Sequence, residues 1–138
     1  MTNFIKLYSI LIIFGSTLLL YSCNKNNSSS TDDTKPIITI AEPTTNDTIT
    51  LTLEPEVHIE FTITDNVGLH NLSVLIIKNN IDTLMNETPS VSDLKVYSFH
   101  EHLMPIGITS LTGFKVIIKA EDHSGNMESK VIDFYVEP

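Results

Sequence analysis

Alternation of apolar and polar residues with a period of two is the feature that most constrains this chain. In residues 57–64, Val, Ile, Phe and Ile alternate with His, Glu, Thr and Thr. Residues 114–121 and 132–136 repeat the pattern, with one lapse at Ile117. Successive side chains of a strand point to opposite faces, so this period predicts β-strands with one face in a core.

Other short apolar runs extend this prediction along the chain. Further strands are predicted at Ile37–Glu42, Ile49–Leu53, Leu72–Lys78, Ile81–Met85 and Leu94–Leu103. Asp, Asn, Gly and Pro lie between these runs, as is typical of turns. Short strands at this spacing predict an all-β fold, namely an immunoglobulin-like antiparallel β-sandwich of about seven or eight strands.

The N-terminus predicts an export signal. The apolar run Leu7–Leu20 follows Lys6 and is shorter than the roughly 20 residues that a membrane-spanning helix needs. It ends in Leu20-Tyr21-Ser22-Cys23, which resembles the bacterial lipobox. That resemblance implies cleavage before Cys23, which is the only cysteine of the chain, and lipid on its sulfur. It also implies an outer-membrane lipoprotein of a Gram-negative cell envelope, on the periplasmic face or the cell surface.

Three parts follow from this reading of the chain. Residues 1–22 are the predicted lipoprotein signal peptide, and 23–35 are the lipidated Cys23 with a flexible linker, since residues 24–35 contain no apolar residue. Residues 36–138 are the predicted sandwich domain, long enough for one ordinary core. The net charge of −9 disfavours nucleic acid and anionic membrane surfaces as partners. A protein or glycan partner is compatible with it.

Three segments carry a family resemblance. They are KPIITI at 35–40, FTITDNVGL at 61–69 and AEDHSGN at 120–126. In these segments the chain is similar to bacterial immunoglobulin-like or cadherin-like domains. It most resembles an uncharacterised family of Bacteroidota lipoproteins with a domain of unknown function, over about residues 35–138. The resemblance implies a non-catalytic extracytoplasmic sandwich on a lipid tether.

Two predicted loops carry oxygen-bearing side chains. If residues 56–65 and 69–78 are strands B and C, and 114–122 and 127–136 are strands F and G, the B–C and F–G loops lie at one end of the sandwich. Asp65, Asn66, Asp122 and Asn126 would then converge, and oxygen ligands of this kind suit Ca²⁺. The alternative is that these side chains only cap their own turns.

Three histidines are expected on one exposed sheet surface. His58 has the outward parity of strand B, and His100 and His102 have the outward parity of Leu94–Leu103, which is taken as strand E. Strands B and E are neighbours in this fold, so the three imidazoles predict a Zn²⁺ site. The alternative is that all three are ordinary solvated side chains. Glu101 falls on the inward parity, which raises the question of whether this register is right.

Strands C, F and G carry apolar residues on both faces. The outward-facing ones are Leu75, Ile77, Ile117, Val131 and Tyr135. A sheet with one solvated face alternates more cleanly than this. Either residues 86–93 or 105–112 cover the outer face, or the face binds a partner.

No catalytic pattern is found. The chain has no Gly-x-Ser-x-Gly motif, no Gly-rich phosphate loop and no pair of acids that can be argued to face one another, which predicts a protein that is not an enzyme. Thr48 and Thr83 each follow Asp and precede an apolar residue, a context that resembles bacterial O-glycosylation sites. The sequence thus predicts an envelope interaction module, with a Ca²⁺- or Zn²⁺-binding envelope protein or an accessory subunit of an outer-membrane complex as alternatives.

Overall fold

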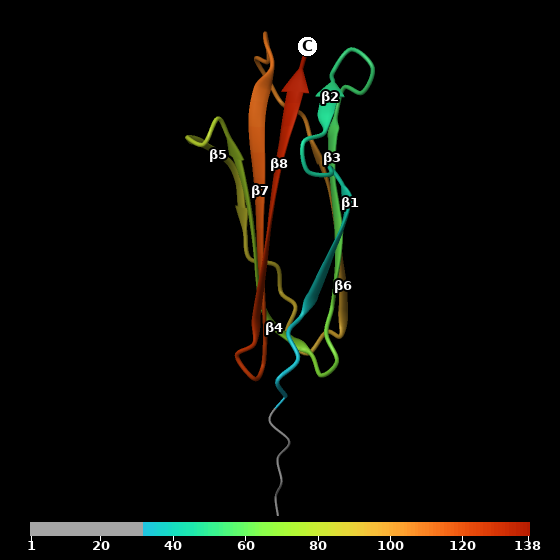
Figure 1. Ribbon diagram of the computed structural model, residues 1–138, viewed down its shortest axis with the longest axis vertical. Coiled ribbons are helices and arrows are strands. Elements are labelled where there is room, and N and C mark those ends of the chain that lie inside the picture. Colours follow the sequence, from blue (N-terminus) through green and yellow to red (C-terminus); the bar gives the residue numbers. More distant parts are fainter. Residues whose placement is uncertain (1–31) are drawn as a thin grey trace, which may run out of the picture. The chain divides into compact units, whose positions relative to one another are not determined.

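The computed structural model describes residues 32–138, which form eight β-strands in two facing sheets (Figure 1). The strands are β1 (Ile37–Glu42), β2 (Thr48–Thr50), β3 (Val57–Thr64), β4 (Leu69–Lys78), β5 (Asp82–Glu87), β6 (Val96–Leu103), β7 (Thr112–Asp122) and β8 (Met127–Glu137). The predicted all-β sandwich is confirmed. Cys23 and the predicted signal peptide lie outside the described residues.

The strand order is that of an immunoglobulin-like sandwich. One sheet has the order β1-β3-β6 and the other β2-β8-β7-β4-β5. The predicted strands B and E are β3 and β6, and the predicted strands C, F and G are β4, β7 and β8. Strands B and E are therefore neighbours, and so are strands G, F and C. The pairing of β2 with β8 is parallel, whereas the other pairs of described strands are antiparallel. The connection at 43–47 carries the chain from one sheet to the other without reversing it, and β2 therefore runs beside β8 in the same direction (Figure 1).

The core is built by the alternation seen in the sequence. In β3 the four apolar side chains are each at most 1% exposed, and the polar residues between them face outward. The Phe61 and Phe99 rings stack at a centroid distance of 4.8 Å, and Phe114 stacks on Phe134 at 5.4 Å. Burying an aliphatic or aromatic side chain of this size contributes roughly 1.5–3 kcal/mol, so this double layer of side chains stabilises the facing sheets.

Several strand boundaries differ from the predicted ones. The strand predicted at 49–53 ends at Thr50, because the Thr50 carbonyl oxygen accepts hydrogen bonds from the amides of Leu53 and Glu54 and the chain turns there. The strand predicted from Leu94 begins at Val96. Leu94 instead contacts the start of β4, where its carbonyl oxygen accepts from the Leu69 amide.

The two ends of the sandwich differ in composition. We call one end the base: it comprises residues 32–35 and the turns 65–68 and 122–126 (Figure 1). The opposite end carries exposed apolar side chains in its loops, namely Leu53, Ile81, Met104, Ile106 and Leu111. Along residues 32–138, no helix has the length and apolar character needed to cross a membrane.

Candidate functional site

The turn between β3 and β4 fixes Asp65 at the base. One of its carboxylate oxygens, Oδ1, accepts hydrogen bonds from the amides of Val67 (3.0 Å) and Gly68 (2.6 Å). A Cβ at Gly68 would approach the backbone of Asp93 to 3.3 Å, which explains why glycine is needed at this crowded position. Asp65 is thereby held in a buried position, with only 8% of its surface exposed.

The turn between β7 and β8 holds Asp122 in a similar way. Its Oδ1 accepts from the amides of Ser124 and Asn126, each at 2.8 Å, and its Oδ2 accepts from Asn126 Nδ2 at 2.7 Å. Gly125 has φ 86°, a conformation that suits glycine. Burial raises the pKa of Asp122, but the hydrogen bonds from Asn126, Ser124 and Gly125 outweigh it and bring the pKa below its ordinary value. Asp122 is therefore a buried anion, 1% exposed.

Asp32 completes the group from the start of the described chain. Its Oδ1 accepts from Asn66 Nδ2 (3.0 Å) and from the Thr34 amide (3.1 Å), and its carbonyl oxygen accepts from Asn126 Nδ2 (2.7 Å). Asp32, Asp65 and Asp122 each present a carboxylate oxygen, and these oxygens all lie within 4.8 Å of one another. We call these three residues the acidic cluster.

Within the described residues 32–138, two oxygens of the acidic cluster have no hydrogen-bond partner. Both Asp32 Oδ2 and Asp65 Oδ2 are buried and unpaired. None of the ion pairs found among residues 32–138 involves an acidic-cluster carboxylate. Ca²⁺ binds oxygen at 2.3–2.6 Å, so two oxygens on opposite sides of one ion are about 4.6–5.2 Å apart. The spacing of the acidic cluster fits one hard cation.

The predicted loop residues are thus placed as follows. The structure brings Asp65 and Asp122 together, and it places Asn66 and Asn126 beside them as donors to Asp32. Both Asp side chains cap their turns through Oδ1, and Asp65 keeps Oδ2 free, so turn capping and a free ligand atom coexist in that residue. Sequence reasoning missed Asp32, which lies inside the predicted linker. The available signal was the Asp32-Asp33 pair close before the first predicted strand.

The three predicted histidines also lie together. His58 is on β3 opposite His102 on β6, and His100 is on the same outer face two residues away along β6. Their ring nitrogens lie within 4.8 Å of one another. We call these residues the histidine cluster.

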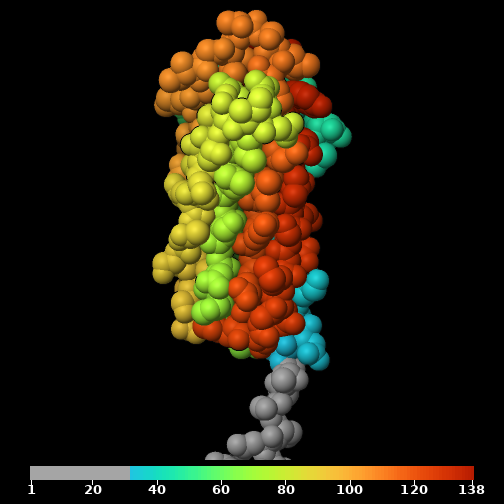
Figure 2. All heavy atoms as spheres, turned by 90° about the vertical axis from the view of Figure 1, so that its left-hand side faces the viewer, coloured from blue at the N-terminus to red at the C-terminus, as the bar shows by residue number. Residues whose placement is uncertain are grey.

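The outer face of the five-stranded sheet carries a short apolar row. Leu75, Ile117 and Val131 are paired side by side on β4, β7 and β8, and Val131 is 51% exposed. Ile77 is half-buried on the same face, where Lys115 and Asp133 are its neighbours across β7 and β8; Tyr135 is 39% exposed. In Figure 2 neither segment 86–93 nor segment 105–112 crosses the middle of this face. We call Leu75, Ile117 and Val131 the outer apolar row.

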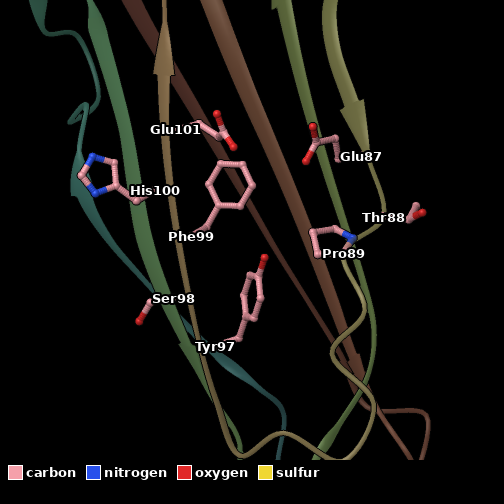
Figure 3. Close-up of a pocket in the computed structure, with 8 residues that line it drawn as sticks. All are labelled: Glu87, Thr88, Pro89, Tyr97, Ser98, Phe99, His100 and Glu101. Atoms are coloured by element: carbon pink, nitrogen blue, oxygen red, sulfur yellow. The ribbon is translucent and has the colours of Figure 1, made fainter.

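An acidic groove of about 420 Å³ opens between the edges of the two sheets (Figure 3). Tyr97 and Glu101 on β6 point toward the Glu87 side of the groove, whereas His100 points away. Burial raises the pKa of Tyr97, and the charges of Glu87 and Glu101 raise it further. Because β6 is an edge strand, the inward-facing Glu101 reaches this open groove, and the expected register is correct.

The remaining predicted residues are Thr48 and Thr83. Both are exposed, on β2 and β5. Their glycosylation stays a prediction, as does lipid attachment at Cys23.

The fold and its base define a class: an all-β, two-sheet sandwich with an acidic cluster where its first strand begins. The chain belongs to the family described as Domain of unknown function (DUF4625), whose model matches residues 21–136. No curated protein matches the chain.

Proposed function

We propose that this protein is a non-catalytic binding module of the bacterial cell envelope that takes up Ca²⁺ in its acidic cluster. The observation that carries the proposal is the pair of buried, unpaired oxygens, Asp32 Oδ2 and Asp65 Oδ2, close to Asp122. A buried acceptor without a partner costs about 1–3 kcal/mol, and more when it is charged. A divalent cation removes this penalty and the mutual repulsion of three carboxylates at once.

The position of Asp32 suggests what the cation does. Asp32 is nine residues after Cys23, the proposed site of lipid attachment. A ligand on this segment and two on the domain's loops would let Ca²⁺ fasten the start of the domain to its base. Extracellular Ca²⁺ modules have dissociation constants of roughly 10⁻⁴–10⁻³ M, and we expect an affinity in this range at the proposed outer-membrane location.

A calcium titration of the full-length chain in detergent tests the proposal. We expect one Ca²⁺ per chain by calorimetry and loss of that binding in Asp32→Asn. The matched control is Asp33→Asn, which removes the same charge from an exposed neighbour and should bind normally. Equal loss in both variants would mean that net charge, and not a built site, holds the ion.

A second candidate function is protein binding through the outer apolar row. It is favoured by the exposure of Val131 on a face that no described segment crosses (Figure 2). Contacts of this kind are typical of an accessory subunit in a larger membrane complex. Val131→Lys should abolish co-purification of a cross-linked partner, whereas Val96→Lys, on an exposed position of the other sheet, should not. Retention of the partner by Val131→Lys would exclude this face.

A further inference from the structure

The register between β3 and β6 places three imidazoles close together on the outer face of the three-stranded sheet. His58 pairs directly with His102, and Glu60 pairs with His100. The buried residues of β3, Val57 and Ile59, point to the core on either side of His58, which fixes its outward direction. Cross-strand partners have Cβ atoms about 4.5–5.5 Å apart, so rigid backbone holds these side chains within reach of one ion.

The rings are close enough to share a ligand. Ring centroids are 4.4 Å apart for His58 and His102, 4.8 Å for His100 and His102, and 5.9 Å for His58 and His100. Tetrahedral coordination with Zn–N distances of 2.0–2.1 Å places ligand nitrogens about 3.4 Å apart. The nitrogens of the histidine cluster lie within 4.8 Å of one another, so side-chain rotation alone can bring them onto one ion.

A carboxylate orients one of the rings. Glu56 Oε2 lies 2.5 Å from Nδ1 of His102. A metal-bound histidine typically donates its second ring N–H to a carboxylate, which fixes the tautomer and strengthens the other nitrogen as a ligand. With Nδ1 engaged by Glu56, Nε2 of His102 is the nitrogen available to a metal.

We infer that His58, His100 and His102 form a Zn²⁺ site on the outer face of the three-stranded sheet, with Glu56 as the positioning group of His102. Three imidazoles suit Zn²⁺ and not Ca²⁺, which prefers oxygen. The site is separate from the acidic cluster and does not depend on the proposed Ca²⁺ function. His100 and His102 are exposed, so a fourth coordination position faces solvent and can accept water or a donor from a partner.

The test is a Zn²⁺ titration of the full-length chain in detergent, with excess Ca²⁺ present to occupy oxygen sites. We expect one Zn²⁺ per chain, at least a roughly 100-fold loss of affinity in the double variant His100→Gln/His102→Gln, and a roughly 10-fold loss in Glu56→Gln. The matched control is His70→Gln/His123→Gln, because these two rings form a separate pair with centroids 4.7 Å apart. The control should bind Zn²⁺ as the unmodified chain does.

A readout on the unmodified protein keeps the test independent of variant folding. Added Zn²⁺ should shift the imidazole NMR signals of His58, His100 and His102 together, at one equivalent, and leave those of His70 and His123 in place. Unchanged signals from the histidine cluster, or an undiminished affinity in His100→Gln/His102→Gln, would overturn the site.

Discussion

The acidic cluster and the histidine cluster are both groups of three potential ligands, but they differ in what the protein does to them without a metal. Asp65 and Asp122 are buried at the base, and the acidic cluster has two unpaired oxygens. The histidine cluster lies on an outer sheet face, with His100 and His102 exposed to solvent. We therefore expect an empty acidic cluster to destabilise the fold and an empty histidine cluster to leave its stability unchanged.

This difference shows how a metal site can be coupled to folding. In the acidic cluster the ligands come from three separate segments, namely residue 32 and the two turns at 65 and 122. A cation there would join three segments whose carboxylates repel one another in its absence. The histidine cluster has all its ligands on two paired strands, so its geometry exists before the metal arrives. The first cluster should respond to metal mainly through stability, and the second mainly through occupancy.

Calcium saturation should give the largest effect. Binding to the folded state alone stabilises by about 2.7 kcal/mol at one hundred times the dissociation constant. For a domain of this size, 1 kcal/mol corresponds to about 4–8 °C, so the Tm should rise by about 10–20 °C over that in chelator. Differential scanning calorimetry measures it. A Tm that is the same in chelator and in Ca²⁺ would contradict a coupling between Ca²⁺ binding at the acidic cluster and folding.

Asp65→Asn should stabilise the protein in chelator and abolish its stabilisation by Ca²⁺. The Asn oxygen can still accept from the Val67 and Gly68 amides, and its amide group can donate toward the unpaired oxygen of Asp32. In chelator the variant should therefore be more stable than the unmodified protein by about 1–3 kcal/mol. Added Ca²⁺ should not raise the free energy of unfolding of the variant. Urea unfolding in both conditions measures the two free energies, and a variant that is destabilised in chelator would contradict an unfavourable empty cluster.

His100→Gln/His102→Gln provides the contrast at the histidine cluster. Because both side chains are exposed, their replacement should change the free energy of unfolding in chelator by no more than about 0.5 kcal/mol. The same urea experiment measures it. A loss above about 2 kcal/mol would show that these rings support the sheet, and the comparison between the two clusters would no longer hold.

The histidine cluster could be predicted from the sequence because it depends only on strand parity and on the adjacency of strands B and E. Both follow from local alternation and the general sandwich topology. The inward parity of Glu101 raised doubt about the register, yet Glu101 pairs with the inward-facing Ile59, so the predicted parity is correct. The resolution lies in tertiary structure: β6 is an edge strand, and its inward-facing Glu101 reaches the groove of Figure 3.

Asp32 could not be predicted because contacts distant in the sequence place it at the base. It lies in a segment without apolar residues, which composition assigns to a linker. It is held by side chains far away in the chain, through Asn66 Nδ2 and Asn126 Nδ2. The end of β2 was missed for a related reason: Thr50 begins a turn through its carbonyl oxygen, although the residues that follow still read as a strand.

Asp47→Asn should give the smallest effect, and it shows how an exposed carboxylate with one hydrogen-bonded oxygen behaves in comparison with the acidic cluster. Hydrogen bonds from the amide and the hydroxyl of Thr44 lower the pKa of Asp47 below its ordinary 3.8. Since the folded-state pKa is the lower one, ionised Asp47 stabilises the fold at neutral pH, and this contribution is lost as the pH falls below 3.8 toward the folded-state value. The variant should therefore melt slightly earlier than the unmodified protein at neutral pH, and the two melting temperatures should converge in acid. A difference that persists in acid would mean that the turn needs the shape of Asp47 and not its charge.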